Sequence, residues 1–104
     1  MKEKRTITHV QAKKIIDSEE NIIILDVREE EEFKKKHIYG AKLIPLNLLE
    51  ITIEKEIPCK ETKILIYCFS GKRSFKALEI LISKGYSNVY NFGGIKDWPF
   101  DVVM

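Results

Sequence analysis

The sequence predicts an α/β protein with a mainly parallel β-sheet that is flanked by helices on both faces. Two runs, residues 22–25 (IIIL) and residues 63–68 (KILIYC), lack polar alternation, which is typical of strands covered on both sides. Helical patterns alternate with the strands, as the connections of a parallel sheet require. The chain has 104 residues, of which 44% are hydrophobic and 33% charged, so we expect a single domain over residues 1–104.

The first two helices are predicted from their end signals. Thr8 and Gln11 have the spacing of a capping box, which starts a helix over residues 9–17. Residues 29–36 (EEEEFKKK) place acids before bases, the order that the helix dipole favours, and predict a short solvated helix. The expected apolar face of the first helix comprises Val10, Ala12, Ile15 and Ile16.

The middle of the chain has a less regular pattern. Gly40 marks a turn, and residues 42–44 predict a short strand that breaks before Pro45. We interpret residues 46–58 as a helix followed by a loop.

The last part of the chain predicts an amphipathic helix and a final strand. The helix begins at about Phe75 and stops at Gly85, and residues 88–92 (NVYNF) form the strand. A glycine turn and a short helix follow, and their Trp98 is expected in the core. The expected inward face of the long helix comprises Phe75, Leu78, Leu81 and Ile82.

Charge and hydropathy argue against several classes of function. The formal net charge of +2 favours neither a nucleic-acid partner nor a membrane partner. No apolar run has the length of a signal peptide or a membrane span, so a cytoplasmic protein is expected.

The two cysteines predict neither a disulfide nor a metal site. Neither Cys59 nor Cys68 lies in a CxxC motif or in a Cys/His cluster of metal-ligand spacing, and we expect no metal and no cofactor. The strand between them would hold their ends about 17 Å apart, whereas a disulfide needs Cα atoms within about 7 Å. We therefore interpret Cys59 as a surface or loop thiol.

Cys68 is the candidate functional residue. It ends the stronger strand, and sites in parallel sheets lie beyond the carboxyl ends of the strands, where Asp26 and Arg28 also lie. The loop that follows, residues 68–74, reads CFSGKRS and leads into the long helix. Gly71 permits this loop to curl with its N–H groups inward, and the helix adds further N–H groups and the positive end of its dipole.

Lys72 and Arg73 add two positive charges to the same loop. Together these features predict a cradle for an anion, centred on the sulfur of Cys68. They favour the thiolate over the thiol, lower the pKa of the cysteine and make it a nucleophile near neutral pH. The alternative is a buried cysteine at a strand end, followed by an ordinary polar loop.

Four motifs resemble, in order along the chain, the single-domain rhodaneses, a family of sulfurtransferases. They are IILDVREEEEF, HIYGAKLIP, YCFSGKRS and GYSNVYNFGGIKDW, and they cover nearly the whole chain. They are similar to the family's Asp-Val-Arg-Glu strand end, its His-Ile-Pro-Gly-Ala segment, its active loop, and its closing Gly-Gly-Ile and Trp. The resemblance implies a rhodanese-like domain, in which parallel strands are flanked by helices.

The resemblance also implies the chemistry and the partners. Cys68 would be the catalytic residue: its thiolate would attack the outer sulfur of thiosulfate or another sulfane donor and then carry a persulfide. Cyanide, a small thiol or a protein thiol would accept this sulfur. The residues implied to bind the substrate, through their N–H groups and through the charges of the two cations, are Phe69, Ser70, Gly71, Lys72, Arg73 and Ser74.

Three further residues are expected to support the site from outside. Asp26 and Arg28 would pair or tie the backbone. His37 would hydrogen-bond neighbouring loops, because a cradled thiolate needs no general base.

Three positions depart from the pattern that the resemblance implies. Phe69 stands where many members have an arginine, which predicts weak use of thiosulfate and a preference for an organic or protein-bound persulfide. Lys36 and Tyr39 replace a common glycine and a common proline, and they are expected to alter a turn and not the chemistry.

The sequence leaves two other functions open. A cysteine phosphatase or arsenate reductase of related fold also uses a cysteine, a backbone cradle and an arginine. Such enzymes have five residues between the two, whereas Cys68 and Arg73 are separated by four, and Tyr67 replaces their preceding histidine. The second alternative is a non-catalytic rhodanese-like binding module, although such modules usually lack the cysteine. A sulfur relay, which forms the persulfide but passes the sulfur only to one dedicated protein partner, is intermediate between a non-catalytic module and a sulfurtransferase that uses free acceptors.

Overall fold

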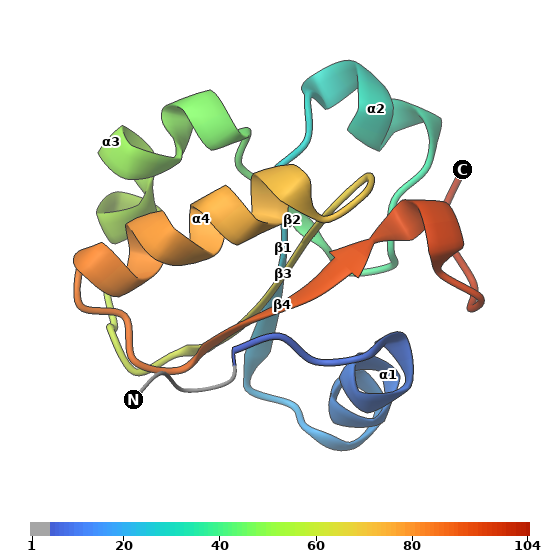
Figure 1. Cartoon of the computed structure of the whole chain (residues 1–104), viewed down its shortest axis with the longest axis horizontal. Helices are drawn as coiled ribbons and strands as arrows, with labels where there is room; N and C mark the ends of the chain where they lie inside the picture. Colours follow the sequence, from blue (N-terminus) through green and yellow to red (C-terminus); the bar gives the residue numbers. More distant parts are fainter. Residues whose placement is uncertain (1–4) are drawn as a thin grey trace.

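The computed structural model describes residues 5–104, and Figure 1 shows the arrangement of the chain. In order along the chain, the elements are α1 (His9–Ser18), β1 (Ile22–Asp26), α2 (Glu30–Lys35), β2 (Lys42–Leu43), α3 (Leu46–Glu56), β3 (Lys63–Cys68), α4 (Lys72–Ser83), β4 (Val89–Gly94) and the 3-10 helix η1 (Ile95–Asp97). The predicted helices and strands are therefore present, with changes at their ends.

The strands form one parallel sheet in the order β2-β1-β3-β4. β1 and β3 occupy the middle, which explains their uninterrupted apolar sequences. The outer edge of β4 is covered by the N-terminal segment, where Thr6 pairs with Asn91 in parallel orientation. The predicted α/β class is confirmed.

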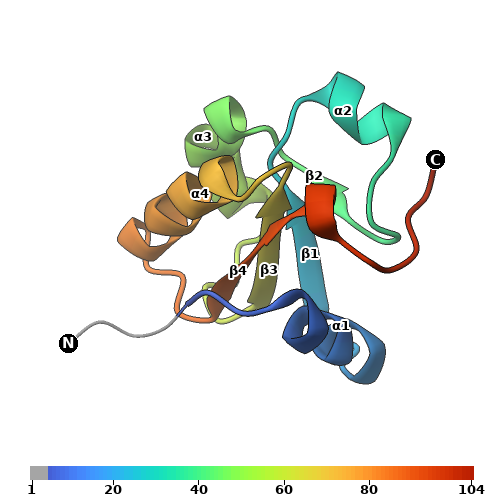
Figure 2. The same cartoon turned by 45° about the vertical axis from the view of Figure 1, so that its right-hand side comes forward.

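Helices cover both faces of the sheet, as predicted. α3 and α4 pack on one face and α1 packs on the other (Figures 1 and 2). Successive residues of β3 point to opposite faces: Ile66 and Cys68 join the core beneath α3 and α4, whereas Leu65 and Tyr67 join the core beneath α1. The side chain of Cys68 therefore lies on the same side of the sheet as α4.

The first helix begins at the predicted capping box. The N–H of Gln11 donates to Thr8 Oγ1 at 3.0 Å, and the N–H of Thr8 donates to Gln11 Oε1 at 2.8 Å. Ala12 is buried, as expected, but the inward position predicted for Val10 is wrong, because its side chain is 57% exposed. Residues two apart on a helix do not face the same side, and Ala12 occupies the buried side.

The long helix α4 differs from its predicted form at its start and on its buried face. It begins at Lys72, three residues before Phe75, so the second half of the predicted loop is the first helical turn. The inward positions predicted for Phe75 and Ile82 are wrong, because these side chains are 51% and 45% exposed. The buried face comprises Ser74, Ala77, Leu78 and Leu81, which have the spacing of one helix side.

The remaining elements follow the sequence closely. Trp98 is buried, as predicted, and packs beside Phe92 and Phe100. Its Nε1 has no hydrogen-bond partner in the part of the chain that the structure describes. No helix within residues 5–104 is long and apolar enough to cross a membrane.

Candidate active site

Cys68 lies at the carboxyl end of β3 and is almost fully buried, with 1% of its surface exposed. Both cysteines are free, and Cys59 is exposed. The prediction that the two do not pair is therefore confirmed.

The sulfur of Cys68 accepts hydrogen bonds from the backbone that follows it. The N–H of Gly71 lies 3.0 Å from Sγ, and the N–H of Ser74 lies 3.4 Å from Sγ. The Ser74 hydroxyl oxygen lies 3.5 Å from Sγ, 3.1 Å from the carbonyl oxygen of Gly71 and 3.3 Å from that of Gly93. The predicted cradle of inward N–H groups thus forms around the sulfur.

The Ser74 hydroxyl has two sets of partners, and the charge of the sulfur decides between them. The Cys68 thiol donates to the Ser74 oxygen, and the hydroxyl proton then points to the carbonyl oxygen of Gly71 or Gly93. A thiolate carries no proton, so the same hydroxyl turns and donates to the sulfur. Ser74 can therefore satisfy both protonation states of Cys68.

The local sequence explains why the loop closes in this way. Gly71 precedes the first residue of α4 with φ +106°, a left-handed conformation that side chains other than glycine rarely adopt. No side chain caps α4, and the N–H of Ser74, in the first turn, donates to Cys68 Sγ instead. The sulfur occupies the position that a capping oxygen has in other helices.

The hydrogen bonds change the acidity of the thiol. Burial of Cys68 raises the pKa of its thiol, but hydrogen bonds from the Ser74 hydroxyl and from the N–H groups of Ser74, Gly71 and Ser70 outweigh burial. The net effect is a pKa below the ordinary value for a cysteine. The site therefore favours a nucleophilic thiolate.

Gly94 supports the loop from the neighbouring strand. It pairs with Cys68 across β3 and β4, and a Cβ atom at Gly94 would lie 1.9 Å from the carbonyl oxygen of Phe69. That carbonyl accepts the N–H of Lys96 at 3.0 Å. A glycine is required here, because the Cys68 loop rests directly on the backbone of β4. The Gly-Gly pair is visible in the sequence, but this contact joins distant segments and cannot be found from local patterns.

Of the two cations predicted in the Cys68 loop, Lys72 and Arg73, only Lys72 lacks an ion pair within residues 5–104. Arg73 donates from Nη1 and Nη2 to the two carboxylate oxygens of Glu32, at 2.8 and 3.0 Å. Lys72 is exposed and forms no ion pair within residues 5–104. α2 is therefore more than a solvated helix, because Glu32 ties it to the first turn of α4. This role of Glu32 is not visible in the sequence, because its partner lies 41 residues further along the chain.

The ion pair changes the acidity of Glu32. Hydrogen bonds from the Arg73 side chain lower the pKa of its carboxyl from 4.5 to about 2, although partial burial acts in the opposite direction. Glu32 thus stays ionised in mildly acidic solution and keeps Arg73 paired.

Asp26 and Arg28 form a buried pair on the other face of the sheet from Cys68. Arg28 Nε lies 3.0 Å from Asp26 Oδ1, and Arg28 Nη2 lies 2.8 Å from Asp26 Oδ2. Nη2 also donates to the carbonyl oxygen of Lys36 at 2.7 Å. The predicted pairing is present, and it holds the segment after α2.

Tyr67 and His37 fix the same segment. The Tyr67 hydroxyl accepts the N–H of Ile38 at 3.1 Å, and burial raises the pKa of this tyrosine. His37 Nδ1 lies 2.9 Å from the carbonyl oxygen of Phe33, on whose ring the imidazole stacks. Its backbone pairs with Val103. The His37 imidazole therefore hydrogen-bonds helix α2 and not a neighbouring loop, and none of its hydrogen bonds within residues 5–104 reaches the Cys68 loop.

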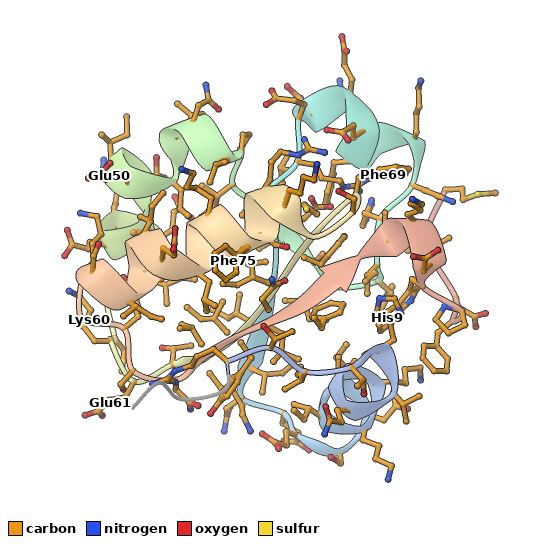
Figure 3. The ribbon with its side chains drawn as sticks, in the orientation of Figure 1. His9, Glu50, Lys60, Glu61, Phe69 and Phe75 are labelled. Atoms are coloured by element: carbon orange, nitrogen blue, oxygen red, sulfur yellow. The ribbon has the colours of Figure 1, made fainter. Side chains whose placement is uncertain are left out.

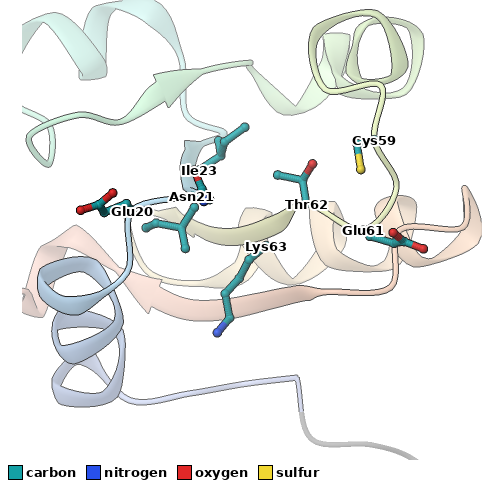
Figure 4. A pocket seen from close by; sticks show the side chains of 8 residues that line it. Glu20, Asn21, Ile23, Cys59, Glu61, Thr62 and Lys63 are labelled. Carbon is teal, nitrogen blue, oxygen red and sulfur yellow. The ribbon is translucent and has the colours of Figure 1, made fainter.

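A hollow of about 520 Å³ lies at the opposite end of the sheet (Figure 4). It is lined by residues that precede or begin β1 and β3, including Asn21, Lys63 and the exposed Cys59. Sites in parallel sheets lie at the carboxyl ends of the strands, so the Cys68 loop is the candidate active site and this hollow is not. No group of three His, Cys, Asp or Glu side chains within residues 5–104 is arranged to hold a metal ion.

Comparison with known proteins agrees with this geometry. The family model described as the rhodanese-like domain matches residues 8–99. The chain is 40% identical over 73 residues to the thiosulfate sulfurtransferase PspE of Escherichia coli. The aligned residues make up 70% of each protein. The chain is also 28% identical over 95 residues to the thiosulfate sulfurtransferase GlpE of Coxiella burnetii. The aligned residues make up 90% of this chain and 86% of GlpE.

Solved structures give the same result. A rhodanese with anions from E. coli matches with a TM-score of 0.73 at 37% identity, over 78% of this chain and 95% of that chain. A rhodanese-related protein from Thermoplasma volcanium matches with a TM-score of 0.81 at 29% identity, over 95% and 97% of the two chains.

The fold and the site define an α/β protein that holds a buried cysteine, with a thiol of lowered pKa, at the carboxyl end of a strand in a parallel sheet. The chain belongs to the rhodanese-like domain family, which confirms the resemblance of its four motifs. Its relatives PspE and GlpE are named thiosulfate sulfurtransferases.

We expect Ser74→Ala to raise the pKa of the Cys68 thiol, because the variant loses the hydroxyl that hydrogen-bonds the thiolate. Hydrogen bonds to charged groups contribute about 1.5–3 kcal/mol, so alkylation by iodoacetamide in mildly acidic buffer should slow by about tenfold or more. The measurement is the pH profile of alkylation in a Cys59→Ser background. Ser83→Ala, which removes a hydroxyl at the far end of α4, is the control. An unchanged profile in Ser74→Ala would contradict the assigned role.

The Glu32–Arg73 pair predicts a pH-dependent contribution to stability. The folded-state pKa of Glu32 lies below its ordinary 4.5, so its contribution is present above pH 4.5 and is lost as the pH falls towards about 2. At neutral pH, Glu32→Gln should lower the free energy of unfolding by about 1 kcal/mol, a figure reduced for partial exposure.

Urea denaturation at neutral pH and near pH 2 measures this contribution. The difference between the wild-type protein and Glu32→Gln should disappear at the lower pH. Glu30→Gln is the matched control on α2, because within residues 5–104 Glu30 forms a single, exposed ion pair with Lys34, whose loss should have little effect. A Glu32→Gln difference that is equal at both pH values would show that the ion pair is not its cause.

Proposed function

We propose that this protein is a sulfurtransferase that moves a sulfane sulfur through a persulfide on Cys68. The observation that supports this most directly is the buried sulfur that accepts N–H groups from Gly71 and Ser74 at the start of α4. Such a site stabilises an anionic sulfur, which is the state of both the attacking thiolate and the persulfide that it forms. Two free cysteines suit the reducing cytoplasm, which is the compartment that we propose.

The first half-reaction loads the enzyme. The Cys68 thiolate attacks the outer sulfur of thiosulfate, or the sulfane sulfur of another donor, and a new S–S bond forms. The S–S bond of the donor breaks, and its electron pair leaves with sulfite or with the donor thiolate. Negative charge is conserved, and it ends on the outer sulfur of the persulfide.

The second half-reaction returns the thiolate. An acceptor, cyanide or the thiolate of a small molecule or a protein, attacks the outer sulfur and takes it. The electron pair of the persulfide bond returns to Cys68 Sγ, where Gly71, Ser70 and Ser74 again stabilise the charge. No external oxidant or reductant is needed in either step.

The electrostatics of the rim favour some donors over others. Of the two cations within the Cys68 loop, Arg73 is paired with Glu32 and only Lys72 is unpaired within residues 5–104, and Phe69 contributes an aromatic ring in place of a charge. Thiosulfate carries two negative charges and would gain less from this loop than from one with an arginine at position 69. We therefore propose an organic or protein-bound persulfide as the better donor.

The alternatives are less well supported. A cysteine phosphatase needs an arginine that binds a phosphate over the sulfur, whereas the guanidinium of Arg73 is engaged by Glu32 on α2. A non-catalytic binding module has no need of a thiol with a lowered pKa. Four residues between Cys68 and Arg73 also form a loop small enough to suit one sulfur atom.

Intact mass spectrometry tests the proposed persulfide. After incubation with thiosulfate or an organic persulfide, the wild-type protein should carry a labile adduct of one sulfur atom. Cys68→Ser should carry none, and Cys59→Ser should behave like the wild type, because Cys59 lies outside the cradle. A protein that takes sulfur from neither donor but hydrolyses a phosphate ester would rule out the sulfurtransferase function.

Steady-state kinetics with thiosulfate and cyanide test the role of Phe69. Phe69→Arg adds a cation at the rim and should raise kcat/KM for thiosulfate by about three- to tenfold, with a larger gain at low salt. Phe69→Leu, which keeps an apolar side chain, is the control and should give no gain. If Phe69→Arg gives no gain either, the identity of this residue does not limit the use of thiosulfate.

A further inference from the structure

Two aromatic rings lie exposed beside the Cys68 loop. Phe69 follows the cysteine directly and is 46% exposed, and Phe75, at the end of the first turn of α4, is 51% exposed (Figure 3). The N–H of Phe75 donates to the carbonyl oxygen of Gly71, so both rings are attached to backbone that forms the cradle. Aromatic side chains are enriched in the surfaces through which proteins bind one another.

Three lysines lie on the segments that carry or contact these two residues. Lys72 and Lys76 lie one turn apart on α4, and Lys96 lies on η1, where its N–H donates to the carbonyl oxygen of Phe69. All three are exposed. We call the set of Phe69, Lys72, Phe75, Lys76 and Lys96 the loop rim.

The lysines of the loop rim have no ion-pair partner within residues 5–104, whereas six of the ten other lysines in this range have one. The lysines that do form ion pairs are Lys13, Lys34, Lys42, Lys60, Lys63 and Lys84. The positive end of the α4 dipole adds to the potential of the loop rim. Positive charge that the protein leaves unneutralised at one place is complementary to a negatively charged partner.

We propose that the loop rim docks an acidic protein segment that carries the acceptor thiol, a proposal that rests on the sulfurtransferase function. Carboxylates of this segment would pair with Lys72, Lys76 and Lys96, and an apolar side chain of it would cover Phe69 or Phe75. Docking brings the partner cysteine to the outer sulfur of the Cys68 persulfide. The partner thiolate takes that sulfur, and the electron pair of the broken S–S bond returns to Cys68.

The loop rim fits a protein segment better than a nucleic acid. Binding to a phosphate backbone requires a wide positive surface that neutralises many phosphates. The loop rim is small, and it is bordered by the exposed carboxylates of Glu79 on α4 and Asp97 on η1. A short acidic segment can avoid these carboxylates, whereas a continuous phosphate backbone has less freedom to do so.

Sulfur transfer to synthetic peptides tests the proposal. Three peptides share one cysteine and one leucine and differ only in their flanking residues, which are glutamate, glutamine or lysine. The protein is first loaded with sulfur on Cys68, and the rate of discharge to each peptide is measured by mass spectrometry. At low salt the glutamate peptide should react about tenfold faster than the glutamine peptide and the lysine peptide more slowly still, and salt should reduce the difference.

Variants locate the effect on the loop rim. Lys76→Gln combined with Lys96→Gln, and separately Phe75→Ser, should slow discharge to the glutamate peptide about fivefold or more, as loss of complementary contacts does. Discharge to 2-mercaptoethanol, a neutral small thiol, should stay within about twofold, because it does not require docking. Lys14→Gln combined with Lys55→Gln makes the same change of charge on α1 and α3 and should have no effect.

The outcomes separate this proposal from the sulfurtransferase function. Equal rates for the three peptides on a loaded protein overturn the docking proposal and leave the sulfurtransferase function intact. Failure to load Cys68 with any donor overturns the sulfurtransferase function itself. Inhibition of the peptide reaction by polyuridylic acid at physiological salt, as strong as that by a cysteine-free glutamate peptide, would reassign the loop rim to a nucleic acid.

Discussion

The hydrogen bonds from the first turn of α4 to the sulfur of Cys68 determine both the local fold and the chemistry of the site. A helix that begins without a capping side chain leaves N–H groups unsatisfied, and here a sulfur at the end of β3 accepts the N–H of Gly71 and that of Ser74. The helix gains its cap, and the sulfur gains donors that favour its negative charge. Structure and reactivity therefore depend on the same contacts, and neither can be altered without the other.

The alternation of side chains along β3 divides the residues around the site into two groups. Cys68 points to the face that α3 and α4 cover, whereas Tyr67 points to the face of α1, where the Asp26–Arg28 pair also lies. The pair and the tyrosine bind the segment that connects α2 to β2, through the backbone of Lys36 and Ile38. They support the edge of the site without touching the sulfur, because consecutive residues of a strand, here Tyr67 and Cys68, point to opposite faces of the sheet.

Local patterns in the sequence were sufficient for the α/β class, the middle strands, the position of Cys68 and the curled loop after it. They were insufficient where distant segments meet. The start of α4 at Lys72 depends on the sulfur as a cap, and the burial of Ser74 turns Phe75 outward. The pairing of Glu32 with Arg73 joins two helices far apart in the chain, and the contact of Gly94 with Phe69 joins β4 to the loop. Periodicity reports which face of an element is apolar, but it does not report which polar side chain finds a partner.

The two hydrogen-bonding arrangements of the Ser74 hydroxyl have a consequence for the speed of the site. When the sulfur gains or loses its proton, the hydroxyl changes partner by rotation about one single bond, while the oxygen itself stays in place. Such rotations take picoseconds to nanoseconds, whereas loop closures take microseconds to milliseconds. The Cys68 loop is already in close contact with the backbone of Gly94, through Phe69 and Ser70, so it cannot move closer to β4. The surroundings of the sulfur are therefore ready in advance for either charge state, and a change in that charge need not wait for the backbone to move.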